Sequence, residues 1–194
     1  LFRSAEVFSE TDIDGYFCGD TARWRTCAQE FRALFVPGAK VAPLLERALA
    51  TLQRRGKTVV AIHLRHSDYG YGRFWIAPPA WYLAWLRALW PTLDDPVLYV
   101  ASENGKFLAD FAEFQPLDAS RLGVEIPGAE FLVDHHILRS ADVLAIANST
   151  FSFTAAMLNT RARGFFRADP WRRALAPFDP WAARSEEHTS ELQS

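Results

Sequence analysis

The sequence predicts an α/β fold with a parallel sheet, because short apolar runs alternate with segments of helical periodicity. Three runs have the length and β-branched composition of buried strands, at residues 57–64, 97–101 and 143–147. A fourth run covers residues 164–167. Since a candidate helix follows each of the first three, the connections predict a Rossmann-like parallel sheet with helices on both faces.

The expected helices show apolar residues at helical spacing and carry proline or glycine at their ends. They cover residues 23–35, 41–52, 78–90, 106–111, 129–140 and 151–158. Pro78 and Pro79 begin one helix, where proline is tolerated, and Gly56 follows another. Residues 113–128 are expected to form a loop with a short strand at 123–126, and the chain beyond Asp169 a surface coil.

Composition excludes several classes of protein. The chain has 194 residues, of which 49% are hydrophobic and 14% aromatic, so it can bury a core and is not a disordered protein. The formal net charge of −2 gives no sign of a nucleic-acid partner. No apolar run approaches the length of a membrane span. Cys18 and Cys27 are too few for a disulfide scaffold or a four-cysteine zinc site, and free thiols in a reducing cytoplasm are the expected state.

The two ends of the chain carry a further expectation. The sequence begins with Leu1, and its last segment, RSEEHTSELQS at 184–194, resembles a translated sequencing adapter. We therefore expect a gene fragment with a non-native tail. The expected organisation is a partial N-terminal segment with a linking helix at 1–56, a Rossmann-like domain at 57–170 and a C-terminal coil at 171–183.

Polar side chains follow three of the predicted strands. These are residues 63–69 (HLRHSDY), 102–104 (SEN) and 148–152 (NSTFS). Because the carboxyl ends of parallel strands meet at one edge of a sheet, and ligands bind there, the three segments are expected to form one binding site.

Arg65 is the strongest candidate for contact with an anion, since its guanidinium is a planar fork of donors that matches phosphate oxygens. Asp68 could orient that fork or bind a sugar hydroxyl. The alternative is an Arg65–Asp68 ion pair that closes a surface turn, which would contribute little.

Asn148, Ser149 and Thr150 precede a helix whose first N–H groups lack partners within the helix. Such residues cap helices, and the same position is an anion site. Beside a strand end with an arginine, phosphate binding is the preferred interpretation. Glu103 could accept hydrogen bonds from ribose hydroxyls or be a solvated loop residue.

A metal site is not expected. Asp134, His135 and His136, together with His63 and His66, suggest one, but no HExxH or comparable spacing is present. The sequence also lacks GxGxxG, GxxxxGK[ST], GxSxG and CxxC motifs.

Four segments carry a resemblance to a known family. They are 14–17 (DGYF), 61–69 (AIHLRHSDY), 97–104 (VLYVASEN) and 142–159 (DVLAIANSTFSFTAAMLN). In order and spacing they are similar to the GYF, HxRRxDY, Ser-Asp strand and NSTFS-type motifs of the fucosyltransferase superfamily. The sequence most resembles bacterial α-1,2-fucosyltransferase-like proteins.

The resemblance implies the donor-binding half of a GT-B-like enzyme, with residues 1–56 on the acceptor side. Such an enzyme transfers fucose from GDP-fucose to a glycan hydroxyl with inversion and needs no metal or other cofactor. The resemblance implies catalytic roles for Arg65, His63 and Asp68. It implies donor binding by Arg65, Asn148, Ser149, Thr150 and Ser152, to which the position after the strands adds His66 and Glu103 as candidates.

The sequence departs from the family pattern at three places, one of which is Ser67 in place of a glycine. His66 stands where the motif has a second arginine, so one fixed cation is lost, and Phe153-Thr154 replaces a Trp-Trp pair. Three alternatives remain open: a non-catalytic nucleotide-sugar or glycan-binding relative, a metal-dependent hydrolase, and a protein whose polar strand ends are only solvated loops. The hydrolase would use His63, His66, Asp68 and His135.

Overall fold

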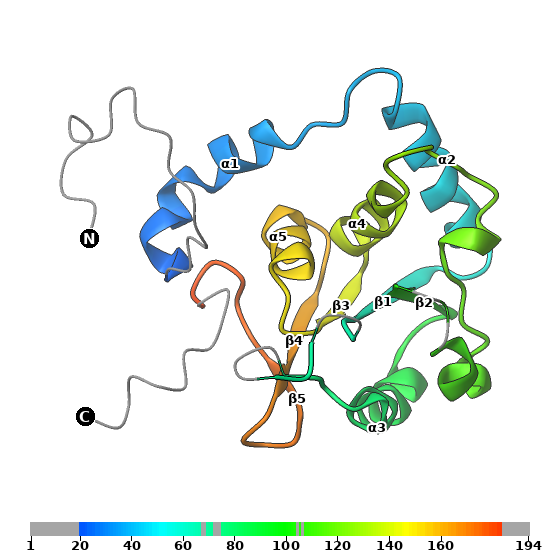
Figure 1. Cartoon of the computed structure of the whole chain (residues 1–194), viewed down its shortest axis with the longest axis vertical. Coiled ribbons are helices and arrows are strands. Elements are labelled where there is room, and N and C mark those ends of the chain that lie inside the picture. Colours follow the sequence, from blue (N-terminus) through cyan, green and yellow to red (C-terminus); the bar gives the residue numbers. More distant parts are fainter. Residues whose placement is uncertain (1–19, 67–68, 72–74, 104, 106, 184–194) are drawn as a thin grey trace.

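A computed structural model describes residues 20–66, 69–71, 75–103, 105 and 107–183. Its centre is a five-stranded sheet with the order β2-β1-β3-β4-β5 (Figure 1). The strands are β1 (Thr58–Leu64), β2 (Pro96–Ser102), β3 (Val143–Ile146), β4 (Gly164–Asp169) and β5 (Ala174–Pro177). The first four are parallel and β5 is antiparallel to β4.

Strand β1 lies in the middle of the parallel part, and all seven of its residues are buried. It pairs with β2 from Thr58 to Leu64 and with β3 from Val60 to Ile62. The central strands expected from their apolar composition are therefore present, with ends that differ by a residue or so.

Helices cover both faces of the sheet, as predicted. The helices are η2 (Thr21–Cys27), α1 (Ala28–Leu34), α2 (Ala42–Gln53), α3 (Pro79–Leu89), η3 (Trp90–Thr92), η4 (Leu108–Phe114), η5 (Ala119–Arg121), α4 (Phe131–Ser140) and α5 (Thr150–Leu158), where η marks a 3₁₀ helix. One core packs α2, α4 and α5 on one face of the sheet, and a second packs α3 and η4 on the other. Figure 1 shows this three-layer arrangement, which is that of a Rossmann-like fold.

Asn159 fixes where α4 and α5 end relative to the sheet. Its Nδ2 donates to the carbonyls of Leu138 (3.1 Å) and Ala141 (2.9 Å) at the end of α4. Its Oδ1 accepts from the N–H groups of Arg161 and Ala162, each at 2.8 Å. Because Asn159 directly follows α5, one buried amide holds together both helices that flank β3.

The short strand expected at residues 123–126 is absent from the described structure, and this prediction was wrong. Val124 and Ile126 are buried in the core but pair with no strand. The outer edge of β2 is instead covered by Leu117, whose N–H donates to Leu98 (2.9 Å) and whose carbonyl accepts from Val100 (2.8 Å). Buried and exposed residues alternate here as they do in a strand, although no partner strand is present, and this alternation led to the wrong prediction.

The chain beyond Asp169 differs from the surface coil that was expected at 171–183. Strand β5 returns antiparallel to β4, and Trp181 is buried. The indole Nε1 of Trp181 donates to the Met157 carbonyl at 3.1 Å, at the end of α5. Thr21 donates through Oγ1 to the Pro180 carbonyl at 2.8 Å, so this segment joins distant parts of the chain.

Two helical predictions need smaller corrections. The helix expected at 23–35 is divided at Cys27 into η2 and α1, because Cys27 has non-helical φ and ψ of −102° and 17°. The helix expected at 106–111 is the 3₁₀ helix η4, and residue 106 lies outside the described residues. None of the described helices is both long enough and apolar enough to span a lipid bilayer.

Candidate functional site

The three polar strand ends meet at one cavity of about 610 Å³, here called the central cavity. It lies at the carboxyl ends of β1, β2 and β3. The chain passes from β1 to β2 on one side and later to β3 on the other, so the strand order reverses between β1 and β3. Ligands bind at such a switch point in open α/β sheets. The polar wall includes His63, Arg65, Ser102, Glu103, Ser149 and Thr150.

The rest of the wall comes from the loop after β1 and from the region around α4. It consists of Tyr69, Tyr71, Ala119, Glu130, Phe131, Asp134 and Phe151. Polar groups from several elements therefore converge on a partly aromatic cavity, which is the composition typical of ligand sites.

Arg65 is held at the cavity by two neighbours. Its guanidinium forms an ion pair with Glu103, and it lies over the Tyr69 ring with 5.6 Å from Cζ to the ring centroid. The side chains of Arg65 and Glu103 are 30% and 24% exposed, so the pair is partly shielded from water. The expected alternative partner, Asp68, lies outside the described residues. Because a guanidinium has five donor hydrogens, Arg65 can keep Glu103 and still bind an anion.

His63 is buried at the end of β1, and its Nδ1 has no hydrogen-bond partner within the described part of the chain. Burial, followed by the positive charge of Arg65 and then by His66 and His135, lowers the pKa of His63 to about 3. The imidazole is therefore neutral at pH 7. One of its ring nitrogens can donate a hydrogen bond and the other can accept one, but the ring is a weak base.

Helix α5 begins at the cavity with Ser149 at its N-cap position. Among the described residues, the Ser149 side chain makes no capping hydrogen bond to the first turn. The Ser149 carbonyl instead accepts from the Phe153 N–H at 3.0 Å and from Ser152 Oγ at 3.3 Å. The Ser149 side chain leaves this helix N-terminus uncapped, and Arg65 lines the same cavity, so together they have the chemistry of an anion site.

Four of the predicted site residues are not on the described wall of the central cavity. His66 stacks on Phe107 with 4.0 Å between ring centroids, and burial lowers its pKa although Glu103 and Asp110 oppose the shift. Asn148 and Ser152 are buried behind the wall. Asp68 lies outside the described residues, as does the segment 14–17 of the family resemblance.

Asp134 is a wall residue that the sequence did not predict as part of this site. Its Oδ1 accepts from the buried Tyr99 hydroxyl at 2.5 Å. Burial raises the pKa of Asp134 to about 6; the Tyr99 hydrogen bond opposes this shift and Asp118 adds to it. A carboxyl group with such a shift in a cavity is a mark of a functional site. In the sequence Asp134 stood out only beside His135 and His136, as part of a metal site that was not expected.

Ser102 is a second group whose position suggests contact with a ligand. Its Oγ is buried, lines the central cavity and has no hydrogen-bond partner in the described structure. An unpaired buried hydroxyl is costly, so such groups commonly have a role in binding.

The described residues give no support to the metal-dependent hydrolase. Among them, no three His, Cys, Asp or Glu side chains lie close enough together to hold a metal ion. His63 and His135 lie against the same Phe151 ring, with 5.4 Å and 5.2 Å between centroids, rather than at a common ligand position.

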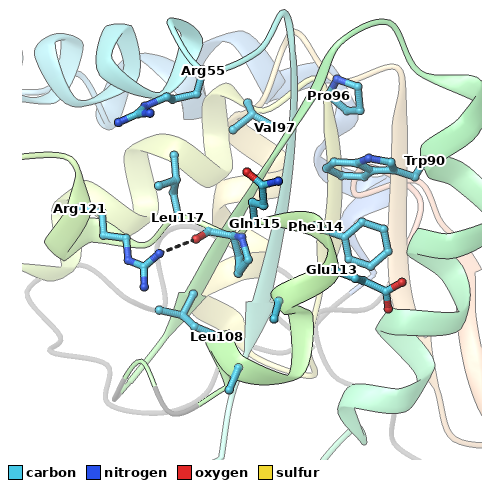
Figure 2. Close-up of a pocket in the computed structure, with 13 residues that line it drawn as sticks. Arg55, Trp90, Pro96, Val97, Leu108, Glu113, Phe114, Gln115, Leu117 and Arg121 are labelled. Atoms are coloured by element: carbon cyan, nitrogen blue, oxygen red, sulfur yellow. Dashed lines mark hydrogen bonds between the residues drawn. The ribbon is translucent and has the colours of Figure 1, made fainter.

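A larger cavity of about 960 Å³ lies along the outer edge of the sheet beside the start of β2, and we call it the edge cavity (Figure 2). Its wall mixes polar and apolar groups, with Trp90 packed on Phe114 at 4.9 Å between centroids. Two of its three charged groups have partners, since Arg121 donates to the Pro116 carbonyl at 3.2 Å and Glu113 accepts from Arg87; Arg55 is the third. No carboxyl end of a parallel strand reaches it, so the central cavity is the better candidate despite its smaller volume.

The fold and the cavity define a Rossmann-like α/β domain with a ligand site at the carboxyl edge of its sheet. No family model matches the chain, and neither does any curated protein sequence. Among solved structures, the chain is similar to a crystal structure of NodZ alpha-1,6-fucosyltransferase soaked with GDP-fucose, with a TM-score of 0.48 and 14% sequence identity. The similarity covers 71% of this chain and 48% of the other, so the chain spans about half the length of that structure.

Proposed function

We propose that the central cavity binds the diphosphate of a nucleotide sugar and that the chain is a glycosyltransferase of fucosyltransferase type. The observation that carries the proposal is the common position of Arg65 and the N-terminus of α5 on one cavity wall, between β1 and β3. A volume of about 610 Å³ suits a ligand of this size. The donor in this proposal is GDP-fucose, in line with the family resemblance of the sequence motifs.

In this proposal the protein stabilises the departing diphosphate. The acceptor oxygen forms a bond to the anomeric carbon from the face opposite the phosphate, while the bond from that carbon to the phosphate oxygen breaks. The charge that develops on GDP is met by Arg65 and by the first N–H groups of α5, which are already oriented. These two groups would take the part that a metal ion takes in other transferases, so we expect activity without one.

The acceptor must also lose a proton during the transfer. From the family resemblance we propose His63 or Asp68 as the group that takes up this proton. With a pKa of about 3, neutral His63 would hold the acceptor hydroxyl by a hydrogen bond more than it would take up its proton. Glu103 would orient Arg65 through their ion pair or accept from a ribose hydroxyl.

Asp134 gives the proposed site a means to select the base. A carboxylate accepts well from two neighbouring N–H donors, and among the common bases guanine presents such a pair on its pairing edge. In this proposal the base lies toward Asp134 and the diphosphate toward Arg65.

The test is binding of GDP by calorimetry. We expect Arg65→Ala to abolish measurable GDP binding, because the main cation of the cavity is lost. Arg87→Ala is the matched control, since Arg87 makes an exposed ion pair with Glu113 away from the cavity. Unchanged affinity in Arg65→Ala would contradict the proposal. Thermal shifts with GDP, UDP, ADP and CMP would test the donor class, with a selective rise expected for GDP.

A non-catalytic nucleotide-sugar-binding protein is a second candidate. The low pKa of His63 favours this candidate, because His63 is then only a weak base for a transfer reaction. The position of His66 off the described wall of the central cavity favours it as well. Such a protein would bind GDP as tightly but release no fucose from GDP-fucose during long incubation with glycan acceptors. For either candidate we propose a cytoplasmic location.

A further inference from the structure

A third cavity, of about 550 Å³, adjoins the central cavity, and we call it the side cavity. It lies between the segment that joins α1 to α2 and the helices α4 and α5. Phe131, Thr150 and Phe151 belong to the walls of both cavities. A ligand in the side cavity would therefore lie next to the N-terminus of α5, where the proposed diphosphate rests.

Most of the side-cavity wall is apolar and open to solvent at its rim. Phe35, Val36 and Pro37 form one side, and Phe131 and Phe151 the other. Val36 is 71% exposed and Phe131 57%, although both are large apolar residues. Flat apolar walls of this kind suit the C–H face of a sugar ring, while the open rim lets a longer chain of sugars extend into water.

Two histidines of α4 supply polar groups to this wall. His136 is only 7% exposed, and neither of its ring nitrogens has a hydrogen-bond partner in the described structure. Its Nε2 lies 3.5 Å from Glu46 Oε1, beyond good hydrogen-bond geometry. Burial lowers the pKa of both His135 and His136, so each ring is neutral, with one donor and one acceptor nitrogen.

Sugar hydroxyls match the unpaired nitrogens of His136 and the neutral ring of His135, because a hydroxyl both donates and accepts. A buried imidazole without partners costs free energy, which a bound hydroxyl or a bridging water would recover. The described wall contains no carboxylate, and its one full charge, Arg139, donates to the Phe35 carbonyl at 2.8 Å. The cavity therefore has the character of a site for a neutral or weakly acidic hydroxylated ligand.

We infer that the side cavity binds the acceptor glycan, with a sugar ring on the aromatic wall and hydroxyls directed to His135 and His136. This inference rests on the proposed function, since an acceptor is needed only if a sugar is transferred. Thr150 lies on both walls, so a glycan here would have its end near the sugar attached to the diphosphate.

The experiment measures sugar binding and GDP binding separately on the full chain. Saturation-transfer NMR with methyl β-galactopyranoside and methyl N-acetyl-β-glucosaminide, in the presence of GDP, measures sugar binding in the side cavity. Calorimetry with GDP reports the central cavity. The variants are Val36→Arg, which fills the cavity from an exposed position, and His136→Leu, which removes the ring nitrogens at similar volume. Trp171→Ala removes an aromatic side chain that is 78% exposed and lines neither cavity, and it is the control.

We expect at least one of the two sugars to bind, and its affinity to fall about tenfold or more in both variants. GDP affinity and melting temperature should be kept, and His136→Leu should melt no lower than the parent, because an unpaired buried group is removed. Sugar binding that is unchanged in both variants, or absent in the parent while GDP binds, would overturn the inference. If the parent protein does not bind GDP, this result would instead overturn the proposed function.

Discussion

His63 and Asp134 lie on one cavity wall, and burial shifts both of them toward their neutral forms. The pKa of His63 falls to about 3 and that of Asp134 rises to about 6. A surrounding that disfavours charge on these two groups leaves Arg65 as the main cation at the cavity. An incoming diphosphate would therefore depend mainly on Arg65 for its attraction to the cavity, where burial makes electrostatic contacts strong.

The raised pKa of Asp134 makes a prediction about stability. Since the folded-state pKa lies above the ordinary value of 3.8, the ionised carboxylate destabilises the fold at neutral pH. Asp134→Asn keeps an acceptor for the Tyr99 hydroxyl and removes the charge. We expect it to raise the free energy of unfolding at pH 8 by up to about 3 kcal/mol, which corresponds to the rise of the Asp134 pKa from 3.8 to about 6.

The advantage of Asp134→Asn should shrink as the pH falls through about 6 and vanish near pH 4, where wild-type Asp134 is protonated. Urea titrations at several pH values would measure this. Asp94→Asn, at an exposed residue, is the control. A difference that stays constant with pH would show that the pKa of Asp134 is not raised.

Residues that follow strands could be assigned to the site from sequence, and residues on helices could not. Arg65 and Glu103 line the cavity because each directly follows a buried strand, and Ser149 because it follows soon after β3; the apolar pattern locates all three strands. Asp134 was missed because its place depends on how α4 packs against β2 through the Tyr99 hydroxyl, a contact between distant parts of the chain. His66 was assigned from its motif, but packing on Phe107 turns it from the described wall.

Among the elements, the four parallel strands were predictable and the antiparallel edge strand β5 was not. A strand buried on both faces, such as β1, has a continuous apolar run that local sequence reveals. Strand β5, with the sequence ALAP and a proline at its end, is short and only partly buried. Its pairing with β4 depends on the turn at residues 170–173, and no local pattern distinguishes it from coil.

Gly56, between α2 and β1, is required by close packing of two elements. A Cβ at this position would lie 2.7 Å from the Asp95 carbonyl oxygen and 3.0 Å from Val97 Cβ, both at or near the start of β2. We therefore expect Gly56→Ala to lower the free energy of unfolding by about 1–3 kcal/mol, as overpacking does elsewhere. Urea denaturation would measure it.

Gly38→Ala is the matched control for this substitution. A Cβ at Gly38 would meet no atom within 4 Å, so the same change should have little effect on stability. Equal effects of the two substitutions would show that the backbone near Gly56 is not as close to β2 as the structure has it.

On the scale of the whole molecule, the C-terminal segment at 171–183 contributes Trp181 to the core and is not only a surface coil. The Trp181 ring packs edge-on against Phe31 of α1 at 5.6 Å, and its indole N–H donates to the end of α5. We expect Trp181→Ala to destabilise the protein by about 3–5 kcal/mol, measured by thermal or urea unfolding. Trp171→Ala, at a residue 78% exposed on the β4–β5 turn, should have little effect. A surface coil at 171–183 would instead make both substitutions equally mild.

The central place of β1 has a consequence for how the protein moves. Its backbone is hydrogen-bonded to a strand on each side and shielded by a helical layer on each face. The amide hydrogens of such a strand exchange with deuterium only when the whole domain opens, and their exchange rate then reports the global free energy. His63 and Arg65 are thus anchored at the end of the slowest-exchanging segment, whatever motion the surrounding loops have.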